Sequence, residues 1–406
     1  MKNVLSRIFS INIDLYSGIW TVYCLFKKFR FKFLFKGLEE NKDYENLVRS
    51  NFYQLYEKLL DRDINKNFSI DSKKKFSAAY TDAWFTVKYF FPNSSFEKFT
   101  EDKVYDVIFM AGLGAHKQNI RALYNAQFNN TPIVVYEDGF IHSITTPFEK
   151  KCPKKYLYGI SHVFDNSGIF FDATRPTLLE NMLNDKNLVI TEEQKQRARN
   201  LINKIVEDKI SMYNHQPIYV PNIGRPNKKK VLVVDQSYRD ASIVKGLVSA
   251  KTFNDMLETA IKENPDSDII VKTHPYTLSG VRLGYFTDLK EHDNIFILKT
   301  PINPISLLEY VDEVYGCTTH MGFEALMCGK KVHIFGMPFY AGWGLADEKM
   351  SIERRRNKRS LEEVFYIAYI LYSRYYNPNT QKECEIEDAI NYIKELREEY
   401  FTKIGL

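Results

Sequence analysis

The sequence predicts an α/β protein in which two Rossmann-like domains face each other across a cleft. Two observations lead to this prediction. In residues 104–136 and again in residues 231–335, short apolar runs typical of buried strands alternate with stretches typical of helices. Acidic, glycine or hydroxyl residues directly follow several of these runs, at the strand ends where parallel sheets hold their ligands. A chain of 406 residues is also long enough for two separate cores.

The composition is that of a soluble globular protein, with 44% hydrophobic and 26% charged residues. The five cysteines show no C-x-x-C spacing, so we expect neither disulfides nor a zinc site, as in a reducing cytoplasm. The net charge of +5 is uneven, because residues 1–36 contain seven basic residues and one acid, an excess of six. The rest of the chain therefore carries about −1, which argues against a nucleic-acid partner.

Residues 1–40 are predicted to lie on the surface of a membrane. Their basic residues are mixed with aromatic and aliphatic ones, a combination that suits an anionic bilayer surface. Asp14 and several polar residues interrupt the apolar stretch, so it is a poor transmembrane span, and it lacks the cleavage site of a signal peptide. The alternative is a helix that packs on the neighbouring domain.

The first α/β domain is predicted over residues 41–215. After a mainly helical region, buried strands are expected at 104–110 and 132–136. The second of these strands runs into Glu137 and Asp138, which we expect at the ligand-binding edge of the sheet.

A proline-rich stretch after residue 215 predicts an interdomain linker, and the second α/β domain is predicted over residues 216–350. Two of its strands are followed by polar residues of interest. These are Gln236, Asp240 and Ser242 after the strand at 231–234, and Lys272 and His274 at the end of the strand at 269–272. Residues 351–406 are predicted to form helices that brace the domains, with an interruption at Pro378.

Residues 318–347 predict a site for a phosphate or another anion. Thr318 and Thr319 precede a short helix whose free backbone N–H groups suit a nucleotide phosphate, and Glu324 is placed to reach a ribose hydroxyl. A glycine-rich loop with three large aromatic residues follows, and such a loop is costly to order unless it closes over something. The alternative is an ordinary helix cap followed by a packed loop.

No compact D-x-D, H-E-x-x-H or P-loop motif appears, so we expect a metal-independent site. A leaving phosphate must then be neutralised by cations and helix dipoles, with Lys272 and His274 as candidates. Asp240 and one of Glu137 or Asp138 are candidate carboxylates on opposite sides of the cleft, and one of them would be the nucleophile in a glycosyl transfer. Helix-cap and turn roles are the alternatives for these acids.

Five ordered strings resemble the signature of the bacterial capsule polysaccharide synthesis family that contains the retaining β-Kdo glycosyltransferases. Residues 321–347 match a "GFEALL-GK-V--FG-PFYAGWGLTDD" pattern except at Met327 and Ala346, and Glu348, the next residue, replaces its last aspartate. The other strings are residues 137–141 in "EDGF-RS", 165–176 in "DD-GIYYDA-RPS-LE", 235–242 in "DQ---DAS" and 271–275 in "VK-HP". The usual arginine of the "EDGF-RS" string is His142 here, which marks a weaker anion contact or a different acceptor. The resemblance covers roughly residues 105–359.

The resemblance implies a GT-B-like glycosyltransferase that moves Kdo from CMP-Kdo, with retention, onto a lipid-linked Kdo-phospholipid acceptor, with no cofactor and no metal. Carried over, Asp240 is the nucleophile, Glu137 is its acidic partner, and His274 contacts the CMP phosphate. The other residues implied to bind nucleotide or substrate are Asp138, Gln236, Ser242, Lys272, Thr318, Thr319, Glu324, Tyr340 and Trp343. The implied setting is the cytoplasmic face of the inner membrane, bound peripherally, with the capsule synthesis and export machinery as partners.

Two other functions are compatible with the same residues. Because His142 departs from the family pattern, the fold is also expected to suit transfer of a different sugar from a nucleotide donor. The second alternative is a non-catalytic capsule assembly or export factor that retains a transferase fold, and the presence of both Glu137 and Asp240 argues against it.

Overall fold

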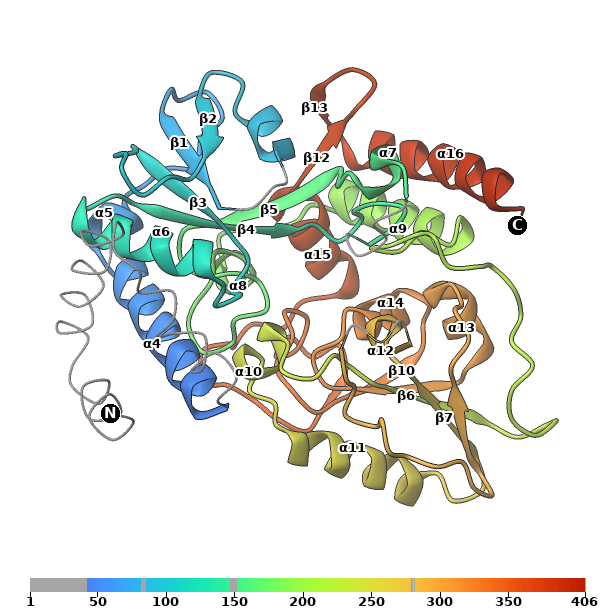
Figure 1. The fold of residues 1–406 in the computed structure, drawn as a ribbon. Helices are drawn as coiled ribbons and strands as arrows, with labels where there is room; N and C mark the ends of the chain where they lie inside the picture. The colour runs from blue at the N-terminus through green and yellow to red at the C-terminus, as the bar shows by residue number, and fades with distance from the viewer. Residues whose placement is uncertain (1–41, 82–84, 147–151, 279, 281, 406) are drawn as a thin grey trace. The chain divides into compact units, whose positions relative to one another are not determined.

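Figure 1 shows the fold in a computed structural model, which describes residues 42–81, 85–146, 152–278, 280 and 282–405. The predicted membrane-surface segment, residues 1–40, lies outside these ranges. The chain divides into two compact units, residues 1–83 with 93–135, and residues 84–92 with 136–406. The domain boundaries expected from the sequence at residues 40, 215 and 350 are a different division and stay predictions.

The first unit contains parallel strands and three helices within the described ranges. These elements are α4 (Lys42–Leu60), α5 (Asp63–Lys66), β1 (Ser77–Tyr80), β2 (Ser95–Lys98), β3 (Val107–Ala111), α6 (Lys117–Phe128) and the first part of β4 (Ile133–Asp138). β1 pairs in parallel with both β2 and β3. The first four residues of β3 are buried, as expected for a strand that is covered on both faces. The predicted strands at 104–110 and 132–136 therefore exist.

β4 continues into the second unit, where three more strands follow it in the sheet order β13-β12-β5-β4-β3-β1-β2. They are β5 (Ser161–Asp165), β12 (Ser373–Asn377) and β13 (Lys382–Cys384). β12 runs antiparallel to both of its neighbours. The prediction of helices throughout the C-terminal region is therefore wrong for these two strands, because Tyr375 and Tyr376 favour a strand and Pro378 starts the turn between them.

The C-terminal helices themselves are confirmed. They are α15 (Leu361–Phe365), the π-helical turn η2 (Tyr366–Tyr372) and α16 (Ile386–Ile404). Ser360 begins α15 with a capping box in which its side chain and that of Glu363 bond to each other's backbone N–H. π-helical turns are rare and occur often at functional sites.

A second sheet has six parallel strands in the order β11-β10-β9-β6-β7-β8, as the sequence predicts for an α/β layer. The strands are β6 (Lys230–Val234), β7 (Asp268–Lys272), β8 (Ile295–Leu298), β9 (Glu313–Gly316), β10 (Lys331–Ile334) and β11 (Asp347–Glu348). All residues of β6 and β7 are buried, which explains their unbroken apolar runs.

The remaining helices of the second unit connect these strands or cover them. They are η1 (Phe85–Phe90), α7 (Lys154–Leu157), α8 (Leu178–Asn184), α9 (Glu192–Glu207), α10 (Ala241–Lys245), α11 (Ala250–Glu263), α12 (Pro275–Leu278), α13 (Pro304–Tyr310) and α14 (Met321–Met327). α9 and α11 each start with a capping box, at Thr191 and Ser249.

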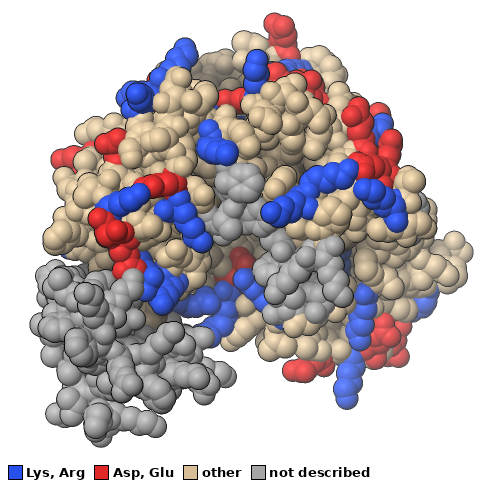
Figure 2. All heavy atoms as spheres, turned by 45° about the horizontal axis from the view of Figure 1, so that its top comes forward, with Lys and Arg blue, Asp and Glu red and all other residues tan. Residues whose placement is uncertain are grey.

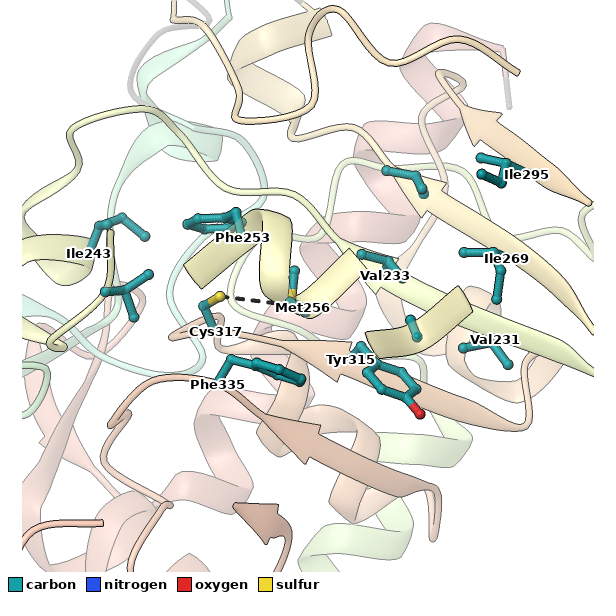
Figure 3. Packing of buried hydrophobic residues seen from close by; sticks show 13 residues of the cluster. Val231, Val233, Ile243, Phe253, Met256, Ile269, Ile295, Tyr315, Cys317 and Phe335 are labelled. Carbon is teal, nitrogen blue, oxygen red and sulfur yellow. Dashed lines mark hydrogen bonds between the residues drawn. The ribbon is translucent and has the colours of Figure 1, made fainter. Parts of the chain in front are cut away.

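The core of the six-stranded sheet lies beneath α11 (Figure 3). Phe253 and Met256 of α11 are fully buried against Val231 and Val233 of β6. The ring of Phe253 also stacks on Tyr285 with centroids 3.9 Å apart. This packing fixes the strands whose carboxyl ends carry the candidate site.

On the face in Figure 2, basic and acidic side chains are interspersed, as expected from the small net charge outside residues 1–36. Within the ranges that the structure describes, no helix is both long enough and apolar enough to cross a membrane.

We predict that Phe253→Ala lowers the free energy of unfolding by about 3–5 kcal/mol, because it leaves a cavity under α11 and removes the stack on Tyr285. Urea unfolding followed by circular dichroism measures the change. Val244→Ala is the control, since Val244 is 50% exposed and should change stability by less than about 0.5 kcal/mol. Equal effects of the two substitutions would contradict the assigned core.

Candidate functional site

The predicted site residues lie near strand ends in the second unit. Glu137 and Asp138 end β4, and Lys272 ends β7. Asp240 follows β6 and immediately precedes α10. Loops at the carboxyl ends of parallel strands meet at one edge of a sheet, which is where this fold class holds its ligands.

Asp240 is both a helix cap and one half of an ion pair. Its Oδ1 accepts hydrogen bonds from the backbone N–H of Ser242 at 3.1 Å and from the Ser242 hydroxyl at 2.9 Å. Its Oδ2 lies 3.0 Å from Nη1 of Arg282, and 40% of the Asp240 side chain is exposed. Ser242 lies two residues after the capping residue, where its backbone N–H and its hydroxyl can both donate to the Asp240 side chain. No sequence pattern marks Arg282, which the prediction missed.

A buried ion pair holds α10 in place. Lys245 Nζ lies 3.3 Å from Asp172 Oδ2, with both side chains almost wholly buried. Lys245 Nζ also donates to the Thr174 hydroxyl. The backbone carbonyl of Lys245 accepts a hydrogen bond from Ala173 N–H at 2.8 Å. The family-like string at 165–176 therefore serves to fix the helix that Asp240 begins.

Lys272 and His274 lie at the end of β7, and only Lys272 is charged at neutral pH. Burial lowers the pKa of His274 to about 4, with the charge of Lys272 as the second cause, and its Nδ1 lies 3.2 Å from the Ser237 hydroxyl. Burial also lowers the pKa of Lys272 to about 8, against the opposing effect of Glu324. No residue in the described ranges forms a hydrogen bond or ion pair with Lys272 Nζ. A buried cation without a partner suits an anionic ligand.

The two threonines before α14 have partners within the protein. Gln236 makes two hydrogen bonds to Thr318. Its Oε1 accepts from Thr318 N–H at 2.9 Å, and its Nε2 donates to the Thr318 hydroxyl at 3.0 Å. The Thr319 hydroxyl accepts a hydrogen bond from Met321 N–H at 3.2 Å. The Thr319 hydroxyl therefore bonds to the backbone at the start of α14, and Gln236 connects the segments that follow β6 and β9.

Glu324 is buried near Lys272. Burial raises its pKa to about 7, and the hydrogen bond from the Ser211 hydroxyl and the charge of Lys272 act in the opposite direction. The predicted contact with a ribose hydroxyl stays a prediction. Ser211 was missed because it lies in a stretch that the sequence marks only as the approach to a linker.

The aromatic residues of the glycine-rich loop hold the loop itself. Tyr340 OH donates to the Thr319 carbonyl, and Trp343 Nε1 donates to the Phe339 carbonyl, both at 2.7 Å. Tyr340 and Trp343 are fully or almost fully buried. Their position supports a role in shaping the site, and their predicted contact with a ligand stays untested.

Stacked rings join the end of β4 to α14. Phe140 lies parallel to His320 at 5.4 Å, to Phe339 at 4.8 Å and to Tyr369 of η2 at 4.8 Å. Tyr369 OH also lies 3.1 Å from His320 Nε2. The two regions that carry the predicted carboxylates and the predicted phosphate site therefore pack directly on each other.

Glu137 and Asp138 differ in their surroundings. Asp138 Oδ2 accepts a hydrogen bond from Tyr213 OH at 3.0 Å, and its Oδ1 lies 3.1 Å from His142 Nε2. Glu137 Oε1 accepts from Asp138 N–H at 3.1 Å, and Glu137 is half-buried. Asp138 is thus held from two sides.

One short segment, residues 210–214, contacts both Glu324 and Asp138. Ser211 bonds to Glu324, and Tyr213 bonds to Asp138. The Met212 carbonyl accepts from the backbone N–H of His142 at 3.1 Å. This segment is a structural part of the site that the sequence did not reveal.

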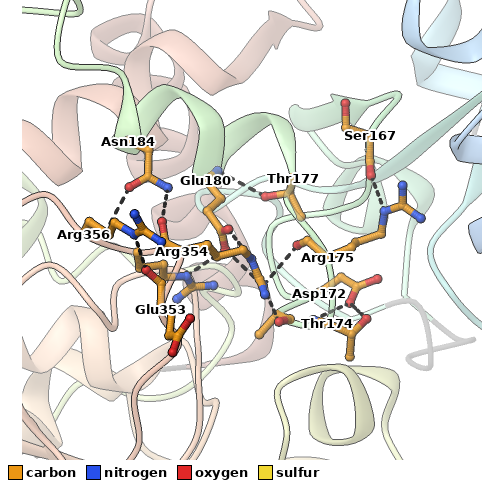
Figure 4. A network of polar contacts seen from close by, with 12 residues as sticks. Ser167, Asp172, Thr174, Arg175, Thr177, Glu180, Asn184, Glu353, Arg354 and Arg356 are labelled. Carbon is orange, nitrogen blue, oxygen red and sulfur yellow. Dashed lines mark hydrogen bonds and ion pairs between the residues drawn. The ribbon is translucent and has the colours of Figure 1, made fainter. Parts of the chain in front are cut away.

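The arginines after the glycine-rich loop are anchored in the protein (Figure 4). Glu180 pairs with both Arg354 and Arg355. Arg355 is buried, donates to the carbonyls of Pro338 and Ala341, and lies over the Trp343 ring. It therefore fixes the backbone of the loop.

No three His, Cys, Asp or Glu side chains are arranged to hold a metal ion in the described part of the chain. Metal independence of the reaction stays a prediction.

Comparisons with known proteins support one family. A model described as "Capsule polysaccharide biosynthesis protein" matches residues 220–375. The capsule polysaccharide modification protein LipA of Neisseria meningitidis serogroup A is 39% identical over 293 residues, which are 70% of this chain and 41% of that protein. The chain therefore matches less than half the length of this relative.

Two solved structures have similar folds. The beta Kdo 2,4 transferase of Thermosulfurimonas dismutans KpsC is 34% identical with a TM-score of 0.71, over 78% of this chain and 98% of that one. The beta Kdo 2,7 transferase of the same KpsC is 26% identical with a TM-score of 0.56, over 79% of this chain and 99% of that one. The GT-B-like fold class predicted from the sequence is thereby confirmed.

Lys272→Met is expected to stabilise the protein below pH 8 by on the order of 2–3 kcal/mol, because it removes a buried charge. The pKa of Lys272 is about 8 in the folded protein and ordinarily 10.5, so between these pH values the unfolded chain binds more protons and the stability of the parent protein rises with pH. The advantage of Lys272→Met should therefore shrink as pH rises from 8 towards 10. Chemical unfolding at several pH values measures it. A variant that is less stable at pH 7 would show that Lys272 has a partner.

Arg355→Met is expected to destabilise the protein by about 3–5 kcal/mol, because Glu180 would keep a buried charge with fewer donors. Thermal unfolding measures the loss. The matched control is Arg356→Met, because Arg356 is exposed and donates through Nε only to the Glu353 carbonyl. A comparable loss in both variants would contradict the anchoring role of Arg355.

Proposed function

Because this chain belongs to the capsule polysaccharide biosynthesis family, we propose that it is a glycosyltransferase that moves Kdo from CMP-Kdo, with retention, onto a lipid-linked acceptor. The observation that carries the proposal is the buried Lys272, whose Nζ forms no hydrogen bond or ion pair among the described residues and whose charge lowers the pKa of His274. Asp240 acts on the same histidine in the opposite sense. A phosphate-neutralising cation and an acid therefore flank one imidazole.

Asp240 is the proposed nucleophile. In the first displacement, a carboxylate oxygen of Asp240 bonds to the anomeric carbon while the bond from that carbon to the phosphate oxygen of CMP breaks, and CMP leaves with the electron pair. In the second, the acceptor hydroxyl attacks the same carbon, displaces Asp240 and passes its proton to a base, for which Glu137 is the candidate. Two inversions give net retention.

Lys272 and His274 would stabilise the departing phosphate in different ways. With a pKa of about 8, Lys272 is mostly charged at neutral pH, and an anion beside it favours the charged form further. With a pKa of about 4, His274 is neutral there and can only contribute an N–H hydrogen bond. In this proposal Lys272 supplies a positive charge and His274 supplies a neutral hydrogen-bond donor.

The acceptor and the location are part of the proposal. The basic and aromatic residues of segment 1–36 suit an anionic bilayer, which supports a peripheral position at the inner membrane and a lipid-linked acceptor. The capsule synthesis and export machinery is the proposed partner. We propose no cofactor besides the donor substrate.

A different donor sugar is the second candidate, and His142 is the observation that favours it. The residue departs from the arginine of the similar string and lies beside Asp138. A panel of nucleotide sugars in the same assay separates the two candidates by which donor releases its nucleotide.

The test is CMP release by the purified chain from CMP-Kdo with a Kdo-phospholipid acceptor. Asp240→Asn should lower the rate by at least about 10³-fold, because the amide is a poor nucleophile. Asp293→Asn is the control, since its side chain is 92% exposed and should leave the rate unchanged. A normal rate in Asp240→Asn would remove this residue from the mechanism, and binding of CMP without any turnover in the parent would favour a non-catalytic assembly factor.

A further inference from the structure

We infer that Arg282 is a specificity-determining residue that binds the carboxylate of the donor sugar, so that the site selects a sugar with a carboxylate on its anomeric carbon. This rests on the proposed function, because Kdo is such a sugar. The contact that leads to it joins Arg282 Nη1 to Oδ2 of Asp240, the proposed nucleophile, at 3.0 Å.

A carboxylate on the anomeric carbon makes attack by Asp240 electrostatically unfavourable. The nucleophile is itself a carboxylate, and it must come within bonding distance of the carbon that carries the second one. Two like charges at such a separation repel each other, and the repulsion is stronger away from bulk water. A cation beside both carboxylates weakens this repulsion, whereas the attack on a neutral sugar does not need it.

The Arg282 guanidinium has the capacity to contact a second carboxylate. It donates to Asp240 Oδ2 through Nη1, and its side chain forms no other hydrogen bond or ion pair with the described residues. A guanidinium has five N–H donors, arranged as a fork that fits a carboxylate with two parallel hydrogen bonds. The Arg282 side chain is 42% exposed, so a ligand can reach the donors that Asp240 does not use.

The position of Arg282 favours the sugar carboxylate over the phosphate of CMP. In a displacement, the leaving group departs from the face of the carbon opposite to the nucleophile. A cation that contacts Asp240 therefore lies on the attacking side, nearer to the substituents of the anomeric carbon than to the departing phosphate. Lys272, which is buried and whose Nζ has no bond to the described residues, remains the proposed cation for the phosphate.

Electrostatic effects on His274 indicate that both cations lie near one centre. The pKa of His274 is lowered to about 4, first by burial and then by the charge of Lys272. Asp240 opposes this shift, and Arg282 adds to it. One imidazole is therefore within electrostatic reach of the proposed nucleophile and of both cations.

The backbone that follows Arg282 is bound to the segment after β6. Tyr238 N–H donates to the Leu283 carbonyl at 2.8 Å, and Tyr285 N–H donates to Asp235 Oδ1 at 2.9 Å. These bonds hold the backbone, while the half-exposed side chain of Arg282 is free to turn. When the guanidinium leaves the nucleophile, it therefore stays within reach of the site.

The contact between Arg282 and Asp240 also discriminates between donors. A neutral sugar offers the guanidinium no anion, so Arg282 continues to cover Oδ2, the oxygen of Asp240 that does not cap the helix. A sugar carboxylate draws the hydrogen bonds of the guanidinium to itself, frees Oδ2, and keeps the positive charge beside both acids. The same carboxylate thus selects the donor and exposes the nucleophile.

The first experiment measures binding without turnover, by isothermal titration calorimetry in the Asp240→Asn background. The ligands are CMP, CMP-Kdo and CMP-N-acetylneuraminate, which has a different sugar with a carboxylate on its anomeric carbon. Adding Arg282→Met should weaken binding of CMP-Kdo by about 10- to 100-fold and change the Kd for CMP by less than about twofold. Adding Lys290→Met instead is the control, because it removes an exposed positive charge near Arg282 in sequence and should change neither Kd.

The pattern of losses separates the two anions of the donor. Equal weakening of CMP and CMP-Kdo would assign Arg282 to the phosphate and overturn the inference. Unchanged binding of CMP-Kdo in Arg282→Met, or no binding of either acidic donor in the background, would overturn it as well. Binding of CMP-N-acetylneuraminate but not CMP-Kdo, with the same loss in Arg282→Met, would support the inference and count against Kdo as the donor.

The second experiment measures CMP release from CMP-Kdo by the full chain with the Kdo-phospholipid acceptor. Arg282→Met should lower kcat/KM by at least about 100-fold, and Arg282→Lys, which keeps the charge without the fork, should recover part of the loss. Lys290→Met should leave kcat/KM unchanged. The thermal midpoint of Arg282→Met should stay within about 2 °C of the parent, because an exposed ion pair contributes little to stability.

The outcomes of the second experiment distinguish the inference from the proposed function. Parent turnover that Arg282→Met does not change would overturn the role of Arg282 and leave the transferase in place. Absence of turnover in the parent, together with the expected binding losses, would count against the proposed function alone.

Discussion

A buried lysine whose Nζ forms no hydrogen bond or ion pair with the described residues is the feature on which this site depends. Lys272 ends a fully buried strand, and burial lowers its pKa to about 8 without removing its charge at neutral pH. Such a charge costs stability unless an anion pairs with it, so the end of β7 is a better candidate for an anion site than the start of α14. Thr318 and Thr319, before α14, already have hydrogen-bond partners, whereas Lys272 Nζ has none among the described residues.

The predicted site residues are held by contacts between segments that are distant in sequence. The ion pair of Lys245 with Asp172 fixes the helix that Asp240 begins. Ser211 and Tyr213 fix Glu324 and Asp138 from one short segment. These contacts order the acids before any substrate arrives, which lowers the cost of reaching a reactive arrangement.

The sequence predicted the parallel sheet and its strand-end residues because both depend on local pattern: an apolar run followed by polar residues shows where a strand ends. It did not predict Ser211 and Tyr213, because their partners are 113 and 75 residues away and no periodicity records such contacts. The strands β12 and β13 were missed because tertiary pairing decided between helix and strand in an ambiguous stretch. For Tyr340 and Trp343, a glycine-rich loop gives no sign of whether its rings face a ligand or the core.

The proposed nucleophile Asp240 has to be held in place and still reach a substrate, and its two carboxylate oxygens make contacts of different strength. Oδ1 caps α10, a contact whose loss typically costs about 1 kcal/mol, whereas Oδ2 meets the exposed Arg282 in a pair of the kind that contributes about 0–1 kcal/mol. For the proposed nucleophile, replacing Arg282 by a substrate is therefore expected to cost less than uncapping the helix. In the proposed reaction the cap would hold the Asp240 carboxylate in place while Arg282 leaves it, and the guanidinium would then be free to bind a negatively charged sugar or phosphate. The contact with Arg282 is therefore expected to break before the cap of α10, because it is the weaker of the two contacts of Asp240.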